Sequence, residues 1–115
     1  MDELIAELNA EASRLGADVR VTRDGGPCYR IVRVVDRFLI THVYDLVLRL
    51  SKAGTAPTAI DLEACRALSS VELTLIGYII TQVRFHGGSV RIRCPSPVNR
   101  RALAMVGFDR LAEVI

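Results

Sequence analysis

The sequence predicts a single α/β domain in which helices cover a small mixed β-sheet. Its 115 residues suffice for one hydrophobic core, since domains of about 100–150 residues are the commonest size. Segments with apolar residues at helical spacing alternate with short segments of period two, in the order helix, strand, strand, helix, strand, helix, strand, helix. Strands separated by a helix pair in parallel through right-handed crossovers, so we expect the later strands to be parallel.

An amphipathic helix and a β-hairpin are predicted for the start of the chain. Residues 2–15 carry acidic side chains early in the segment, and Gly16 follows. The apolar residues of this helix are Leu4, Ile5, Leu8, Ala12 and Leu15. Because the helix is short, they must pack on the domain or on its copy in a homodimer. Two segments of period two then flank Asp24-Gly25, which is a hairpin turn signal.

The middle of the chain is expected to contain a second helix and a buried strand. Thr41 can cap this helix, which we expect to end near Gly54. Its apolar stripe consists of Val43, Leu46, Val47 and Leu50. After a turn that holds Pro57, residues 58–62 read TAIDL, which is short and apolar as in a buried strand.

Two more helices and a strand are predicted for the last part of the chain. The third helix covers residues 70–86 and closes at Gly87-Gly88, and SVRIR follows as a strand. Ser96-Pro97 begins the fourth helix, because serine caps and proline is harmless in the first turn. That helix runs to Gly107, and Phe108 begins a short C-terminal segment.

The start of the third helix has the pattern of a capping box. Ser69 is followed three residues later by Glu72 and then by an apolar run, so each side chain can satisfy the other residue's backbone N–H. Ser70 falls on the first turn, where no cap is needed and the hydroxyl can face water. We therefore expect Ser69 to be structural and Ser70 to be accessible.

The third helix carries two apolar stripes. The first consists of Leu73, Ile76, Ile80 and Val83, and it is expected to lie on the sheet. The second consists of Val71, Leu75 and Ile79. One sheet cannot bury both stripes, so either the N-terminal helix or a partner protein covers the second.

The composition argues against several classes of function. The net charge is +2 and Lys52 is the only lysine, a balance too near neutral to favour nucleic-acid binding. The longest uncharged apolar stretch, residues 73–83, is too short to span a membrane. The N-terminus is acidic and unlike a secretory signal, so we expect a cytoplasmic protein without membrane insertion. A late arginine cluster is either a solvated face or a patch for an acidic partner: Arg91, Arg93, Arg100 and Arg101.

The residues that carry metal or catalytic chemistry lack suitable spacing. Three cysteines and two histidines have no ligand-spaced partners, and the cysteines are interpreted as small buried hydrophobes: Cys28, Cys65, Cys94, His42 and His86. The candidate acids for catalysis have no evident base beside them: Asp45, Asp61 and Glu63. We expect no metal, no cofactor and no enzymatic activity.

Several motifs between residue 29 and the C-terminus follow one another in a specific order. The residues that form them are Ile60-Asp61-Leu62, Ser70, Leu73, Gly87-Gly88, Ser96-Pro97, Arg101 and Gly107-Phe108. In this order and spacing the sequence resembles the STAS family, the domain of bacterial anti-sigma factor antagonists and of related regulatory and transporter-associated proteins. The resemblance implies a STAS domain over residues 18–115, preceded by an N-terminal amphipathic helix extension over residues 1–17.

The resemblance also implies a function. STAS proteins are binding modules, and the best-known ones switch partners when a serine at a helix start is phosphorylated. Ser70 takes that position, with Ser69 as the second candidate, and the implied partner is an anti-sigma factor of the ATPase-kinase type. The implied partner-binding residues are Asp36, Arg37, Phe38, Ser69, Ser70, Val71, Glu72 and Leu75.

Three positions differ from the usual family pattern and favour a second hypothesis. Ser69 and Glu72 stand where the family usually has aspartate and glycine, and Leu39 stands where it often has a partner-contacting aspartate. In the alternative, the chain is a constitutive subunit of a stressosome-like or ABC-transport-associated complex, and Ser70 is unmodified. Retention of a serine at position 70 favours the switch.

Overall fold

The computed structural model describes residues 2–23, 25–53 and 57–115. The elements are α1 (Asp2–Arg14), β1 (Asp18–Thr22), β2 (Cys28–Arg33), α2 (Phe38–Ala53), β3 (Thr58–Asp61), α3 (Ser70–Phe85), β4 (Val90–Arg93), α4 (Pro97–Met105), the 3₁₀ helix η1 (Phe108–Arg110) and β5 (Glu113–Val114). The predicted order of helices and strands is confirmed, and η1 and β5 form the expected C-terminal segment. Asp24 of the predicted turn and Gly54 of the predicted helix end lie outside the described residues.

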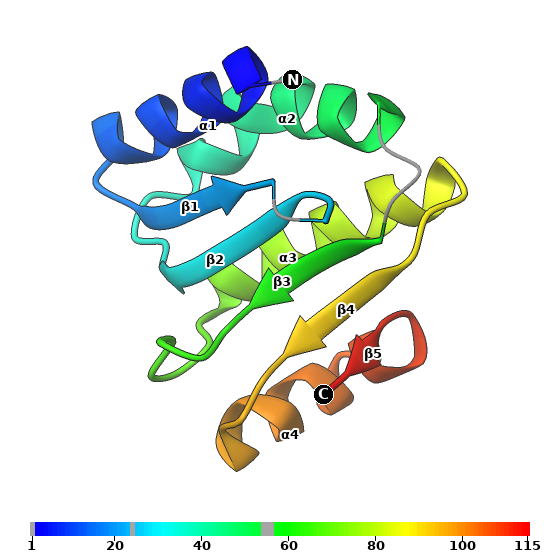
Figure 1. Cartoon of the computed structure of the whole chain (residues 1–115). Helices are drawn as coiled ribbons and strands as arrows, with labels where there is room; N and C mark the ends of the chain where they lie inside the picture. Colours follow the sequence, from blue (N-terminus) through cyan, green and yellow to red (C-terminus); the bar gives the residue numbers. More distant parts are fainter. Residues whose placement is uncertain (1, 24, 54–56) are drawn as a thin grey trace.

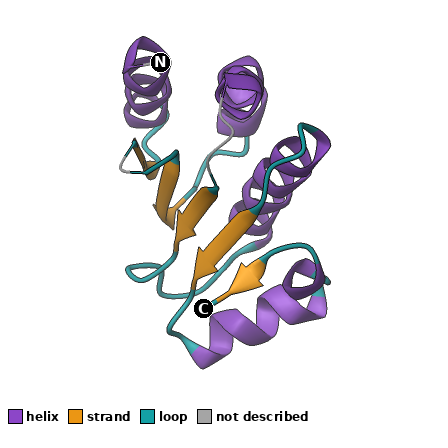
Figure 2. Cartoon of the chain, turned by 45° about the vertical axis from the view of Figure 1, so that its right-hand side comes forward, coloured by secondary structure: helices purple, strands orange, loops and turns teal. Residues whose placement is uncertain are grey.

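The strands form one mixed sheet in the order β1-β2-β3-β4-β5. β1 pairs with β2 in antiparallel orientation, and the following pairs are parallel, as the helical crossovers predict. Helices α1, α2 and α3 lie along one side of the sheet, and α4 lies next to β5 at its edge (Figures 1 and 2). The sheet therefore buries one face under three helices.

The core lies between the sheet and these helices. Alternate residues of each strand point into it, as the alternating exposure along β1 and β4 shows. The largest side chains that are almost fully buried are Tyr29, Ile31, Leu39, Leu50, Ile60, Leu62, Ile76, Ile79, Ile80, Ile92, Leu103 and Val43. Removal of this apolar surface from water is the main favourable term in folding.

The N-terminal helix packs on its own domain, which confirms the first of the two arrangements expected for it. Leu8 and Ala12 of α1 are buried, and α1 contacts both β1 and α2. Asn9 adds a polar contact to the free edge of β1: its Nδ2 donates to the Val21 carbonyl at 3.2 Å, and its Oδ1 accepts from the Val21 N–H at 2.8 Å. A side-chain amide thus takes the place of a neighbouring strand.

Helix α2 begins earlier than predicted. Its first residue is Phe38 rather than one that follows Thr41, which is exposed within the helix. The Asp36 carboxylate accepts a hydrogen bond from the Phe38 N–H at 2.8 Å, so Asp36 supplies the local turn that starts the helix. An earlier start adds Leu39 to the buried stripe of the helix.

The packing of α2 against α3 differs from what we predicted for the two apolar stripes of α3. Leu75 and Ile79 of the second stripe are buried together with Ile76 and Ile80, whereas Leu73 is only half-buried. The helix that packs against α3 is α2, which is neither of the two alternatives that we expected, the N-terminal helix or a partner protein. The rings of Tyr44 and Tyr78 lie 5.0 Å apart between these helices, and Tyr78 donates to the Tyr44 carbonyl at 3.0 Å.

We expect Asn9→Ala to destabilise the fold by about 1–3 kcal/mol, because it removes two part-buried hydrogen bonds to Val21 at once. Ser13→Ala, an exposed change on the same helix, is the control and is expected to leave stability within about 0.5 kcal/mol of wild type. Urea unfolding measures both variants. Equal stability of the two variants would show that the Asn9 amide does not support the edge of β1.

Candidate functional site

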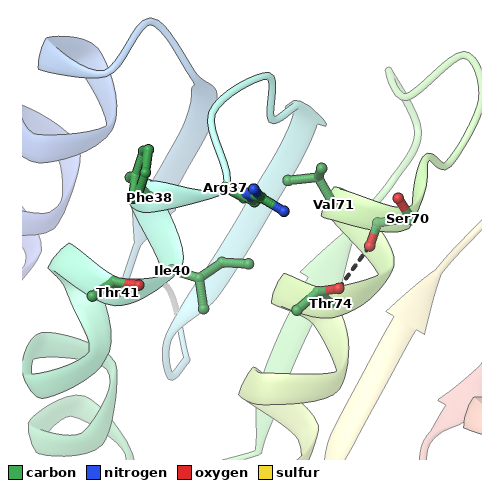
Figure 3. A pocket seen from close by; sticks show the side chains of 7 residues that line it. All are labelled: Arg37, Phe38, Ile40, Thr41, Ser70, Val71 and Thr74. Carbon is green, nitrogen blue, oxygen red and sulfur yellow. Dashed lines mark hydrogen bonds between the residues drawn. The ribbon is translucent and has the colours of Figure 1, made fainter.

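A groove of about 560 Å³ lies between the N-terminal ends of α2 and α3. Its lining residues are Arg37, Phe38, Ile40, Thr41, Ser70, Val71 and Thr74 (Figure 3). Four of the predicted partner-binding residues meet there: Arg37, Phe38, Ser70 and Val71. The groove therefore brings together half of the eight predicted partner-binding residues.

The topology places the two sides of this groove next to each other. α2 follows β2 and α3 follows β3, and these two strands are parallel neighbours in the sheet. The carboxyl ends of parallel strands lie at the same edge of a sheet, so the helices that leave them start side by side. Residues far apart in the sequence, such as Arg37 and Ser70, thus line one groove.

Ser69 is the N-cap of α3, as predicted. Its backbone is extended, with φ −87° and ψ 171°, and its Oγ accepts from the Glu72 N–H at 3.4 Å. The same hydroxyl donates to Oε2 of Glu72 at 2.5 Å. The Ser69 hydroxyl is therefore engaged both as donor and as acceptor.

Glu72 is buried, so its prediction as a partner-binding residue is wrong. Its side chain is 3% exposed, and its carboxylate accepts from the Ser69 N–H at 3.2 Å and from the Val34 N–H at 3.3 Å. The Glu72 side chain folds back over the N-cap to complete the capping box, and this conformation directs its carboxylate into the interior. Glu72 joins the start of α3 to the segment that leaves β2.

Ser70 is exposed at the first turn of α3, as predicted. Its hydroxyl makes no hydrogen bond with any described residue, while its carbonyl accepts from the Thr74 hydroxyl at 2.7 Å. Figure 3 shows the Ser70 hydroxyl turned away from Thr74, at the rim of the groove. Both serines are exposed, but they differ in their hydrogen bonds: the Ser69 hydroxyl is held by Glu72, whereas the Ser70 hydroxyl has no partner among the described residues.

The rest of the groove is apolar with one positive charge. Phe38 is 59% exposed, and Val71 and Ile40 are half-buried. Arg37 is the only charged residue among the lining residues, and its guanidinium points across the groove towards Val71 (Figure 3). An exposed phenylalanine beside half-buried aliphatic side chains is the composition of a docking surface.

Two of the predicted partner-binding residues lie away from the groove surface. Leu75 is 2% exposed and is packed in the core, so its predicted partner contact is wrong. Asp36 does not line the groove, because its carboxylate turns back to the Phe38 N–H at the start of α2. Leu39, at the family's usual aspartate position, is buried too. Arg37 and Phe38, which lie between Asp36 and Leu39, are the exposed residues of this segment.

Asn99 holds the loop that precedes the groove, and the sequence pattern did not predict this role. Its side chain is fully buried; Nδ2 donates to the Cys65 carbonyl at 2.9 Å, and Oδ1 accepts from the Leu68 N–H at 3.0 Å. These bonds tie α4 to the loop that leads into Ser69. The predicted cap of α4 is confirmed, since Ser96 Oγ accepts from the Asn99 N–H at 3.3 Å.

Other kinds of site find little support among the described residues. They contain no group of three or more His, Cys, Asp or Glu side chains that could hold a metal ion. Burial raises the pKa of the Cys65 and Cys94 thiols, which keeps both in the protonated, weakly nucleophilic form at neutral pH. None of the described helices combines the length and the apolar character that a membrane span requires.

Comparisons with known proteins identify the fold. No family model and no curated protein matches the sequence. A Thermotoga maritima protein assigned as an anti-sigma factor antagonist has a similar structure, with 16% sequence identity and a TM-score of 0.63, over 90% of this chain and 88% of that one. An anti-sigma-factor antagonist (STAS) domain protein from Planctomyces limnophilus is similar too, with 17% identity and a TM-score of 0.64, over 85% and 89%. The chain has the fold of these STAS proteins, which confirms the predicted fold class.

We expect Ser69→Ala to cost about 0.5–2 kcal/mol of stability, because it removes the N-cap hydroxyl from α3. Ser70→Ala is the matched control one residue away, and it should cost much less because its hydroxyl holds no described group. Urea unfolding of both variants measures the difference. Equal destabilisation would contradict the assignment of the structural role to Ser69.

Proposed function

We propose that this chain is a non-enzymatic regulatory binding module, similar to an anti-sigma factor antagonist, in which phosphorylation of Ser70 switches partner binding. The observation that carries the proposal is the accessible Ser70 hydroxyl, which lies at the rim of an apolar groove and makes no hydrogen bond with any described residue. The names of the two structural neighbours support the same role. Residues 18–115 would form the switching domain, with residues 1–17 as an extension, and the cytoplasm would be its compartment.

The chemistry of the switch favours Ser70 over Ser69. A kinase would form the bond between Oγ and the γ-phosphorus of ATP, break the bridging bond to the β-phosphate, release ADP and take the hydroxyl proton on its own base. The Ser70 Oγ can enter a kinase active site without loss of a hydrogen bond. Ser69 would first have to give up its bonds with Glu72, which hold the start of α3.

A phosphate on Ser70 would change the groove much more than the fold. It adds about 1.5–2 negative charges at the N-terminal end of α3, where the helix dipole favours anions. Arg37, the one charged residue of the groove lining, offers a second favourable contact. The docking surface around Phe38 and Val71 would become anionic, and a partner would have to desolvate that charge on binding.

The implied partner is an anti-sigma factor of the ATPase-kinase type. It would bind to the surface formed by Arg37, Phe38, Ser70 and Val71, with the exposed Phe38 ring as the apolar anchor. A partner that both binds the groove and phosphorylates its rim would release itself when the reaction is complete. This arrangement requires no catalytic residue from the chain.

The second candidate function is a constitutive subunit of a larger complex. It is favoured by a groove that is already apolar, with Phe38 exposed, in the unmodified chain. In that case Phe38 would dock permanently and Ser70 would remain a free hydroxyl at the interface rim. A gene for a serine kinase beside this one would support the switch, and a transporter operon would support the subunit.

We expect Ser70→Asp to recover at least about tenfold less partner than wild type when tagged protein is isolated from its native host, since desolvation of the added charge by the partner costs more than about 1.4 kcal/mol. Ser70→Ala should recover as much partner as wild type. Thr81→Asp, which adds the same charge at an exposed position later in α3, is the control and should not change recovery. Equal recovery by all four proteins would support the constitutive subunit instead.

A further inference from the structure

The sheet face opposite helices α1, α2 and α3 has no helix over it among the described residues (Figures 1 and 2). Along each strand the residues that alternate with the buried ones point to this face. They are Asp18, Arg20 and Thr22 of β1, Cys28, Arg30 and Val32 of β2, Ala59 and Asp61 of β3, Arg91 and Arg93 of β4, and Glu113 of β5. We call this surface the open face.

An open face is unusual for strands of this orientation. β2, β3, β4 and β5 run parallel to one another, and all-parallel sheets are almost always covered on both faces. Antiparallel sheets commonly leave one face in water, but only β1 and β2 pair in that way here. The arrangement therefore favours a molecule that covers the open face in the cell.

The charges on the open face indicate what kind of molecule this is. The strand register places Arg20 directly opposite Arg30, and Asp61 between Arg30 and Arg93. Like charges directly opposite each other destabilise a sheet. Arg93 is paired with Glu63 at 3.0 Å, but neither Arg20 nor Arg30 has an ion-pair partner among the described residues. Two opposed arginines with a single carboxylate beside them, that of Asp61 next to Arg30, leave an excess of positive charge that an acidic ligand would reduce.

A hollow of about 320 Å³ continues the open face at its end towards α3. Its lining residues are Asp18, Val32, Arg33, Ala64 and Arg66. Val32 and Ala64 offer apolar contact, while Arg33 and Arg66 are exposed and have no ion-pair partner among the described residues. The hollow can take one apolar side chain between two positive charges, with the Asp18 carboxylate also at its wall.

We propose that the open face binds an acidic protein segment. Carboxylates of this segment pair with Arg20, Arg30, Arg33 and Arg66, and one of its apolar side chains enters the hollow beside Val32. The proposal is independent of the switch at Ser70, because it concerns a different surface. It also divides the late arginine cluster of the sequence: Arg91 and Arg93 lie on the open face, whereas Arg100 and Arg101 lie on α4.

The same charges disfavour two other occupants. Asp18 and Asp61 interrupt the arginines, so the face does not match the continuous, evenly spaced charge of a phosphate backbone, whereas a peptide can place separate carboxylates beside the arginines alone; the net charge of the chain is only +2. A second copy that stacked its own open face on this one would bring arginines against arginines. An acidic segment with an apolar anchor complements both the charges and the hollow.

The test measures fluorescence anisotropy of a labelled peptide that has glutamates on both sides of one leucine, at physiological ionic strength. We expect the double variant Arg20→Gln/Arg30→Gln to bind this peptide at least about tenfold more weakly than wild type. Arg101→Gln/Arg110→Gln, with the same loss of charge at exposed positions away from the open face, should change affinity less than about twofold. Thermal unfolding checks the fold: the Tm of the first variant should be unchanged or raised by about 1–4 °C, since two opposed charges are removed.

Four results would overturn the proposal. One is that wild type does not bind the peptide, and another is that both double variants weaken binding equally, which would show an effect of net charge alone. A third is that a DNA duplex binds more tightly than the peptide and is lost in Arg20→Gln/Arg30→Gln, which would make the face a nucleic-acid site. The fourth is a dimer of wild type in sedimentation that the same variant abolishes, which would make a second copy the occupant.

Discussion

The buried carboxylate of Glu72 is the constraint on which the candidate site depends. A charged group in a core is costly unless hydrogen bonds replace its hydration, and here the Ser69 hydroxyl, the Ser69 N–H and the Val34 N–H all donate to it. These bonds fix the start of α3 relative to the end of β2. The groove, the exposure of Phe38 and the accessible Ser70 hydroxyl follow from that arrangement.

The two surfaces of the domain have different chemistry because different elements form them. The groove is made by the first turns of two helices that leave neighbouring parallel strands, so it combines exposed apolar side chains with a positive helix end. The open face is made by strand residues whose alternation exposes arginines. Asn99 reaches the loop before Ser69 from α4, so the C-terminal part of the chain also supports the groove.

Local patterns predicted the local structure well. The Ser69–Glu72 capping box and the Ser96 cap were predicted because capping depends on residues within one turn. The burial of Leu75 was missed because it depends on α2, which covers the second stripe of α3, and that of Glu72 was missed because it depends on the Val34 N–H, which is distant in the sequence. The start of α2 was missed because Asp36, rather than Thr41, forms its first turn. The opposed Arg20 and Arg30 depend on strand register, which a single sequence does not specify.

The central claim is that Glu72 engages the Ser69 hydroxyl and leaves that of Ser70 as the proposed site of phosphorylation. The most direct measurement is mass spectrometry of the protein isolated from its native host, with fragmentation of the peptide that contains both serines to locate a phosphate. We predict a population that carries one phosphate on Ser70 and none on Ser69. A phosphate on Ser69, or a Ser70 that stays unmodified under all growth conditions, would contradict the account.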